Sequence, residues 1–163
     1  DWPFWYLSKS PMKSLKLPNL NLPEIAADII WKDEIAYVKD FIRHKYLVLT
    51  PEEWVRQHFI HLLVEYLNYP KALINIEKGH HYLNSQKRTD IHVYDRKGKI
   101  SLLVECKAAH IPLTSSTIEQ ISIYNQNYHA TCLAITNGMK HYVWQKSADL
   151  KSYKQLSYFP EFT

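Results

Sequence analysis

Apolar residues recur along the chain at two spacings, and the order of these spacings predicts an α/β domain. After Thr50 they recur every three to four residues in the stretch TPEEWVRQHFIHLLVEYLNYP, as on one face of a helix. Thr50 is suited to cap this helix, Pro51 to its first position and Pro70 to follow its end. We therefore predict a helix that starts after Thr50 and ends near Pro70.

Shorter apolar runs bounded by turn residues follow, and they predict strands. Three of these runs come next: Ala72–Glu77, Thr89–Asp95 and Lys99–Lys107. The residues DRKGK between the last two predict a tight turn, so these two strands should be antiparallel neighbours. Thr117–Ala130 predicts a second helix, and the segments TCLAITNG and KHYVWQK predict two more strands around an Asn137-Gly138 turn. The predicted order of elements is α-β-β-β-α-β-β.

The N-terminal part has a weaker pattern. Residues 1–23 carry several prolines and scattered aromatics without a sustained period, which predicts an irregular arm that lies on the domain. Ile29–Val38 places a polar Lys32-Asp33-Glu34 turn between two apolar segments and favours a small hairpin, although its spacing also fits a helix. We expect one domain overall, with residues 1–49 as this arm and hairpin and residues 50–163 as the main unit.

Composition limits the function classes without choosing among them. A chain of 163 residues with 46% hydrophobic content can bury one core. Its net charge of +4 suits a polyanionic partner but is common in proteins without one. It shows neither an apolar stretch of roughly 20 residues nor a signal peptide pattern, and its first residue is not Met. Cys106 and Cys132 lie inside apolar runs, so we expect a reduced, cytoplasmic protein that makes no membrane contact.

Two charges interrupt the apolar run LLVECKA, residues 102–108. Residues two apart in a strand share a face, so Glu105 and Lys107 should project together, away from Cys106 and its apolar neighbours. An acid and a lysine at this spacing often form an ordinary surface pair. The triplets that begin at Asp95 and Asp149 match the same spacing in a turn and in a polar tail. The triplet alone therefore leaves both interpretations open.

A second acid favours a reactive site. Asp90 opens the preceding strand, and the tight turn between the strands should bring it beside Glu105. Two converging carboxylates repel unless a cation lies between them, and oxygen ligands suit Mg²⁺ or Mn²⁺. A neighbouring Lys107 could orient or deprotonate a water and stabilise charge on phosphorus. A surface charge cluster is the alternative to this phosphodiester-hydrolysing site.

The second predicted helix adds two polar candidates. Gln120 and Tyr124 are four residues apart and therefore share a helix face. A glutamine and a phenol there could hold Lys107 or a backbone phosphate. The alternative is that Tyr124 belongs to the core and Gln120 is simply exposed.

Taken together, these residues resemble the PD-(D/E)xK nuclease superfamily, and more closely the N-terminal nuclease domain of type I restriction enzyme R subunits and its small stand-alone relatives. The matching segments are TPEEWVRQHFI, RTDIHVYD, LLVECKA, EQISIYN and AITNG, in that order, over roughly residues 50–145. The resemblance implies a restriction-endonuclease-like fold, in which helices flank a central mixed β-sheet, and divalent-metal-dependent DNA cleavage. Thr89 stands where the superfamily name has Pro, and no motor domain follows within these residues, so the resemblance does not extend to target choice.

The resemblance also implies roles for particular residues. Asp90, Glu105 and the backbone carbonyl of Cys106 correspond to metal ligands, and Lys107 to the catalytic lysine. Gln120 and Tyr124 correspond to the glutamine-tyrosine motif of the RecB-like branch. We therefore expect Mg²⁺ or Mn²⁺ as cofactor and DNA as partner, together with subunits of a restriction-modification system.

Other polar residues have two interpretations each. Glu53 could complete the metal shell or form a capping box with Thr50, and we favour the capping box. Glu77 could supply a further carboxylate or end an exposed strand. His80 and His81 lack the further ligands that zinc needs. Three basic residues of the following loop form either a phosphate-contacting flap or a solvated loop: Lys78, Lys87 and Arg88.

Three functions compete at this stage. The first is a metal-dependent DNA endonuclease domain that acts through Asp90, Glu105 and Lys107. The second is a catalytically weak module that binds nucleic acid or assembles restriction-modification subunits, against which two acids facing a polyanion argue. The third is a structural module whose charge cluster is accidental.

Overall fold

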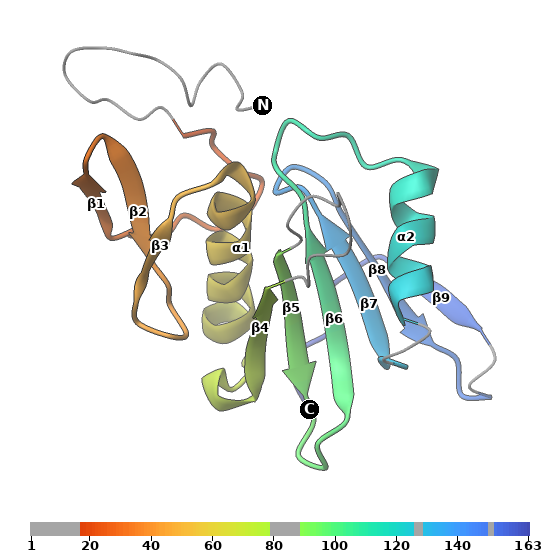
Figure 1. The fold of residues 1–163 in the computed structure, drawn as a ribbon. Coiled ribbons are helices and arrows are strands. Elements are labelled where there is room, and N and C mark those ends of the chain that lie inside the picture. Colours follow the sequence, from red (N-terminus) through yellow and green to blue (C-terminus); the bar gives the residue numbers. More distant parts are fainter. Residues whose placement is uncertain (1–16, 79–88, 126–128, 150–151) are drawn as a thin grey trace.

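The computed structural model describes residues 17–78, 89–125, 129–149 and 152–163, without the side chains of Glu77, Lys78, Thr89, Asp90 and Tyr124. A six-stranded mixed sheet has the order β4-β5-β6-β7-β8-β9 (Figure 1). Its strands are β4 (Ile74–Lys78), β5 (Thr89–Tyr94), β6 (Ile100–Cys106), β7 (Cys132–Thr136), β8 (His141–Lys146) and β9 (Tyr153–Leu156). Only β6 and β7 among these neighbours run parallel. The predicted meander and the hairpin around Asn137-Gly138 are confirmed, whereas β9 was not predicted.

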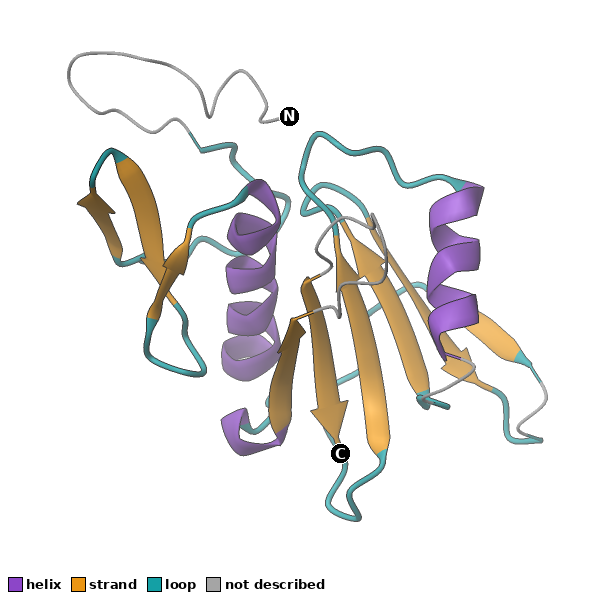
Figure 2. Cartoon of the chain, viewed as in Figure 1, coloured by secondary structure: helices purple, strands orange, loops and turns teal. Residues whose placement is uncertain are grey.

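The two α-helices cover opposite faces of this sheet (Figure 2). Helix α1 (Pro51–His61) continues into a π-helical turn, η1 (Leu62–Tyr66), and packs Val55 and Phe59 against β6 residues such as Val104. Helix α2 (Ser115–Asn125) packs Ile121 against Leu103 on the other face. The predicted mixed sheet flanked by helices is therefore confirmed. Within the described ranges the helices are too short or too polar to traverse a bilayer.

A three-stranded sheet precedes α1 and lies on the side of the helix away from the large sheet (Figure 1). It contains β1 (Ile29–Lys32), β2 (Ile35–Lys39) and β3 (Tyr46–Val48). The predicted hairpin is confirmed and its helical alternative is wrong, because residues 33 and 34 form the tight turn with positive φ angles. Strand β3 was not predicted. Of the predicted arm, residues 17–23 are described and contain neither helix nor strand.

The first helix starts as predicted but extends through η1 only to Tyr66, short of the predicted end near Pro70, and α2 starts at Ser115, two residues before the predicted Thr117. Thr50 caps α1, since its hydroxyl accepts the Glu53 N–H at 3.0 Å, and Pro51 occupies the first turn as predicted. After η1 a short 3-10 turn, η2 (Lys71–Leu73), leads into β4. Helix α2 is described as far as Asn125, and the predicted range goes on through residues 126–128, which lie outside the described residues. Ala130, the predicted end, is not helical, and its N–H donates to the Asn125 side chain at 2.8 Å.

Candidate active site at the end of the central strands

The backbone register brings the two predicted acids together. Strands β5 and β6 are antiparallel, and Asp90 lies directly opposite Glu105 in their ladder. On its other side the backbone of Asp90 is opposite that of Glu77 on β4. Directly opposed residues of antiparallel strands share a face of the sheet. Three acidic positions therefore form one row across β4, β5 and β6, with the side chain described for Glu105 alone.

Glu105 and Lys107 make the contact that their spacing predicts. The Lys107 ammonium lies 3.1 Å from Glu105 Oε1. Glu105 is 3% exposed, whereas Lys107 is partly open to solvent. Leu103, two residues earlier on the same face, packs in the α2-side cluster, while Val104 and Cys106 pack in the α1-side cluster. The strand thus carries its two charges to the α2 side of the sheet, at the end of β6.

Of the two polar candidates on α2, Gln120 lies outside this ion pair. Gln120 is exposed on the helix, and no bond from its amide to Lys107 occurs among the described side chains. The residues of α2 that face the sheet are Thr117, Ile121 and Asn125, each buried. Tyr124 belongs to α2, but its side chain is outside the described part. Gln120 is therefore placed to meet a ligand arriving from solvent.

Cys106 is buried in the core beside this site. Its side chain lies in the α1-side cluster, and its backbone forms a rung with Thr136 of the parallel strand β7. Cys106 and Cys132 are not joined in a disulfide, and burial raises the pKa of the Cys132 thiol. Neither thiol belongs to the charged end of β6.

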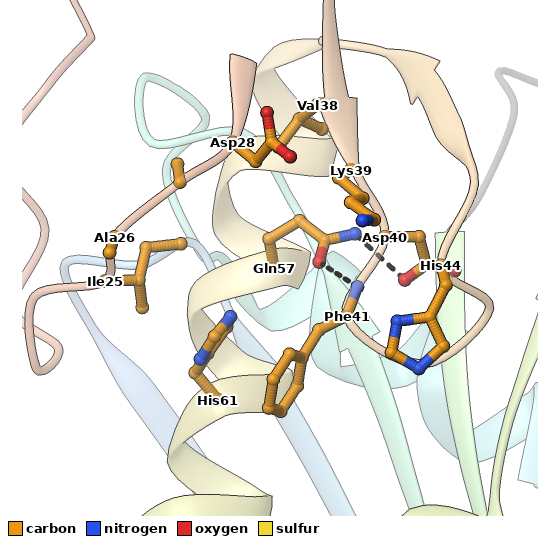
Figure 3. Close-up of a pocket in the computed structure, with 11 residues that line it drawn as sticks. Ile25, Ala26, Asp28, Val38, Lys39, Asp40, Phe41, His44, Gln57 and His61 are labelled. Carbon is orange, nitrogen blue, oxygen red and sulfur yellow. Dashed lines mark hydrogen bonds between the residues drawn. The ribbon is translucent and has the colours of Figure 1, made fainter.

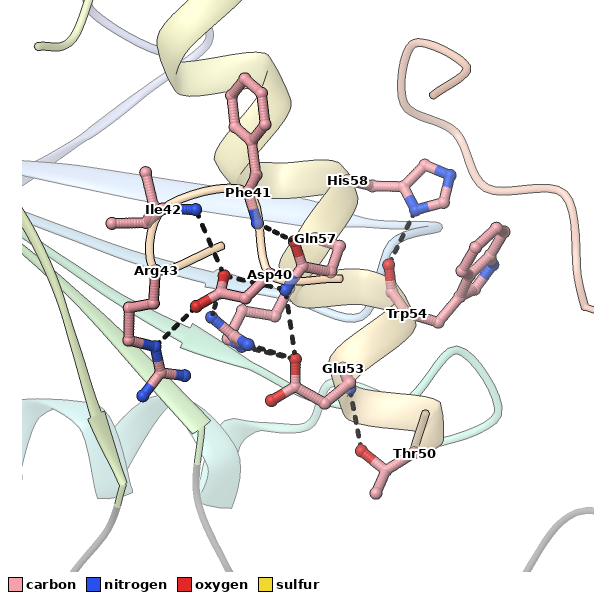
Figure 4. Close-up of polar contacts among 10 residues, drawn as sticks. Asp40, Phe41, Ile42, Arg43, Thr50, Glu53, Trp54, Gln57 and His58 are labelled. Atoms are coloured by element: carbon pink, nitrogen blue, oxygen red, sulfur yellow. Dashed lines mark hydrogen bonds and ion pairs between the residues drawn. The ribbon is translucent and has the colours of Figure 1, made fainter. Parts of the chain in front are cut away.

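Glu53 belongs to a buried ion-pair network at the start of α1 (Figure 4). Its carboxylate accepts from Arg56 Nε at 2.9 Å and also contacts Arg56 Nη2. The Thr50 N–H, which a full capping box would give to Glu53, donates instead to the Val48 carbonyl at 3.0 Å. Half of the predicted capping box is thus present, and the Glu53 carboxylate is held by Arg56.

Asp40 completes the network from the end of β2. It accepts from Arg43 Nε at 2.6 Å and from Gln57 Nε2 at 3.1 Å, and it lies 3.6 Å from Arg56 Nη1. Burial alone would raise the pKa of Asp40. The bond from Arg43, the charge of Arg56 and the bond from Gln57 outweigh burial and lower the pKa. The network joins the small sheet to α1.

This network was not predicted from the sequence. Arg56 is fully buried, and a residue of that charge is rarely buried without partners. A signal was present, because Arg56 precedes Phe59, Ile60 and Leu63 by three, four and seven residues and so lies on the buried helix face. Arginine on an apolar face predicts buried acids nearby.

A cavity of about 280 Å³ lies between the small sheet and α1 (Figure 3). Its lining includes Asp28, Lys39, Phe41, His44, Gln57 and His61. The Gln57 side chain is hydrogen bonded within the protein at this cavity: it accepts the Phe41 N–H at 3.1 Å and donates to Asp40. The lining contains neither Glu105 nor Lys107, so the cavity is separate from the charged end of β6.

Several predicted contacts fall outside the described side chains. Lys87, Arg88, His80 and His81 lie in residues 79–88, and the side chain of Lys78 at the end of β4 is undescribed. Among described side chains no group of three or more His, Cys, Asp and Glu is placed to hold a metal ion. Asp90 and Glu77 are not among those side chains. The acidic side chain that the structure describes in this row is the buried carboxylate of Glu105.

Comparison with known proteins identifies one family. Residues 51–160 match the family model described as type I restriction enzyme R protein N terminus (HSDR_N). No curated protein and no solved structure matches the chain. The matched range contains α1, the whole six-stranded sheet and α2, and it begins after the small sheet.

Proposed function

The chain belongs to the type I restriction enzyme R protein N-terminal family, and from that premise we propose that it is a divalent-metal-dependent deoxyribonuclease domain. The observation that carries the proposal is the Glu105–Lys107 pair, 3.1 Å apart at the end of β6 and directly across the ladder from Asp90. A lysine beside a buried carboxylate, with a second acid opposite, supports hydrolysis of a phosphodiester, because the acids can hold a metal ion and the lysine can stabilise charge on the phosphate.

The donor set suits Mg²⁺ or Mn²⁺. Both ions prefer oxygen ligands, and Glu105 supplies a buried carboxylate. Asp90 and the Cys106 carbonyl are the other proposed ligands, and Glu77 is a further acid in the same row. Bound there, the ion would neutralise negative charge on the phosphate. A buried carboxylate is costly without compensating charge, and Lys107 together with a dication provides it.

Lys107 acts on the attacking water in this proposal. Its partly exposed ammonium lies between Glu105 and solvent, where it orients a water molecule; the neutral amine would instead accept a proton from that water. The water oxygen forms a bond to phosphorus, the ester P–O bond breaks, and the departing oxygen takes up a proton. Lysine also stabilises the negative charge that develops on the phosphate oxygens.

The remaining candidates contact DNA away from the breaking bond. Gln120, exposed on α2, and Tyr124 would contact the phosphate or Lys107. Lys78, Lys87 and Arg88 would contact neighbouring phosphates, which adds affinity without sequence choice. The net charge of +4 agrees with a polyanionic partner.

One observation favours a second function, assembly with restriction-modification subunits. The outer face of the small sheet exposes Ile30, Ile35 and Val48 at 41 to 43% each. Ile30 and Val48 both pair with Tyr37, so they lie in one row across three strands. Exposed aliphatic side chains grouped on a sheet face are typical of interaction surfaces.

Plasmid nicking with Mg²⁺ or Mn²⁺ separates the two functions. Lys107→Ala should lower the cleavage rate by a factor of ~10² to 10⁴, the usual worth of a general base or positioned charge. Lys154→Ala, which removes an exposed lysine of β9, is the matched control and should cleave normally. In gel shifts at two salt concentrations, the salt dependence of DNA binding by each variant should correspond to only about one charge fewer than in the wild type.

Metal binding can be measured separately from cleavage. Calorimetric titration with Mn²⁺ should give heat with the wild type and much less with Glu105→Gln or Asp90→Asn, because each variant removes a carboxylate ligand. High Mn²⁺ should partly restore cleavage to Asp90→Asn but not to Lys107→Ala. Equal nicking by wild type and Lys107→Ala would reject the role of Lys107. Absence of wild-type cleavage on every DNA would leave the assembly module as the better proposal.

A further inference from the structure

The turn between β7 and β8 is shaped by a buried asparagine. Asn137 is 6% exposed, and its Oδ1 accepts the N–H groups of Met139 at 3.0 Å and Lys140 at 2.8 Å. These two bonds close the turn around Gly138, whose φ is 82°. An aspartate at position 137 would offer the same acceptor, so the turn alone does not require an amide.

The amide nitrogen of Asn137 holds a different part of the chain. Its Nδ2 donates to the Ile111 carbonyl at 2.8 Å. The residue before it, Thr136, accepts the Lys107 N–H on its carbonyl, also at 2.8 Å. Two adjacent residues of β7 and its turn thus hold both ends of the segment 107–111. We call this pair of bonds the 107–111 clamp.

The clamped segment directly follows the proposed reactive residues. Lys107 is the first residue beyond β6, and three residues separate Ile111 from the first residue of α2, Ser115. Inside the clamp the Ile111 N–H donates to the Ala108 carbonyl at 3.0 Å, and Ala108 is fully buried. The clamp therefore fixes the backbone of Lys107 and the point from which the chain runs to α2 and Gln120.

We propose that Asn137 is a positioning residue for Lys107: through Nδ2 and the Ile111 carbonyl it holds the turn that sets the Lys107 ammonium against Glu105. This inference rests on the proposed function, because it assigns the clamp a role in hydrolysis. A lysine side chain has four rotatable bonds, so its reach to Glu105 depends on where its backbone is held. A displacement of about 1 Å at a reacting group can cost a factor of ~10² in rate.

The substitution that tests the clamp is Asn137→Asp. It keeps the acceptor for Met139 and Lys140 and replaces the donor to Ile111 with an oxygen that repels the carbonyl. The matched control is His141→Leu, which removes two other bonds of the same turn, to Thr136 Oγ1 at 2.7 Å and to the Asn21 carbonyl at 2.9 Å. Both variants loosen the turn, but only Asn137→Asp releases segment 107–111.

Amide hydrogen exchange and single-turnover cleavage test the effect of the two substitutions. Amide hydrogen exchange of Lys107 and Ile111 should become at least about tenfold faster in Asn137→Asp than in His141→Leu. Single-turnover cleavage with protein in excess should slow by about tenfold in Asn137→Asp and stay within about twofold in His141→Leu. The DNA dissociation constant should stay within about twofold in both, since no phosphate contact is removed.

The possible failures are distinct. Unchanged exchange at Lys107 and Ile111 in Asn137→Asp would overturn the clamp, whatever the cleavage rate. Equal slowing of cleavage in both variants, in step with their melting temperatures, would reduce Asn137 to a structural residue and overturn its positioning role. A wild-type protein that cleaves no DNA would overturn the proposed function and the catalytic part of this inference together, while the exchange data would still decide whether Asn137 holds the segment.

Discussion

The buried charges that join the small sheet to α1 give a sharp test of the fold, through Asp40→Asn. The Asp40 and Arg56 side chains are both fully buried. Asparagine has the shape of aspartate and keeps an oxygen for Gln57 Nε2, which lies 3.1 Å from Asp40 Oδ1. The substitution therefore removes a charge without opening a cavity, and any loss of stability reports the ion pairs.

The expected loss follows from the partners that remain. Breaking a buried ion pair by removing one partner costs about 3–5 kcal/mol, because a buried charge is left uncompensated. Glu53 still contacts Arg56 in the variant, so we expect about 3 kcal/mol, the lower end of that range. Arg43→Met is the matched control: it removes the partly exposed partner of Asp40 and should cost about 1 kcal/mol or less.

Urea unfolding of the wild type and variants at neutral pH measures these losses. The double variant Asp40→Asn, Arg56→Met should lose less free energy of unfolding than the sum of the two single variants, because it leaves no buried arginine without its acidic partner. Since the folded pKa of Asp40 is lowered, its contribution is full above the unfolded value of 3.8 and is lost as the pH falls below it. A loss in Asp40→Asn no larger than in Arg43→Met would refute this reasoning.

Three further predictions concern the rest of the fold. Gly138→Ala should destabilise more than Gly98→Ala in urea unfolding: both glycines have φ of 82°, which costs alanine about 1 kcal/mol, but only at Gly138 would the new Cβ approach Leu20 at 2.8 Å. The free energy of unfolding should fall as the pH drops below 6.5, because burial lowers the pKa of three histidines and the unfolded chain therefore binds more protons than the folded one. In His141→Leu the free energy of unfolding should fall less steeply with pH, because one of these histidines is gone. These histidines are His58, His61 and His141. A chain of residues 50–163 should lose cooperative unfolding by circular dichroism, because Leu20, Leu22 and Phe41 pack against the main core.

The central part of the fold was predictable because local signals there agree. The turn after β5 is closed by its own residues: the Asp95 side chain accepts the Lys97 N–H at 2.8 Å and the Lys99 N–H at 2.9 Å. A turn of fixed length sets the register of the strands beside it. The turn alone does not give the pairing of Asp90 with Glu105, because the register shifts by one residue between Val93 and Tyr94. Without that shift Asp90 would lie opposite Val104, on the other face of the sheet.

The rest depended on tertiary packing. Strand β3 has three residues and β9 four, too few for a pattern of alternation to be distinctive. Which face of α2 meets the sheet was also undetermined, because Tyr124 and Ile121 both fit an apolar stripe. The structure turns Ile121 and Asn125 inward, and Gln120, about 100° away from Ile121 around the helix, is exposed. The orientation of a short helix with weak amphipathicity is set by its loops and neighbours.

The matched family range begins at residue 51, yet the fold does not begin there. Asn21 donates its N–H to the Gly138 carbonyl at 2.8 Å, so the segment before the small sheet is bonded to the turn that carries Asn137. That turn holds the chain leaving Lys107, and Val55 of α1 packs beside it at Gly138. The segment of residues 17–50 is thus linked to the proposed active site by this turn. It is linked to α1 by Asp40, which lies beside Arg56. Because Asn21 is bonded to the turn at Gly138, a change at Asn21 should act on cleavage only as far as it moves Asn137 and, through it, Lys107.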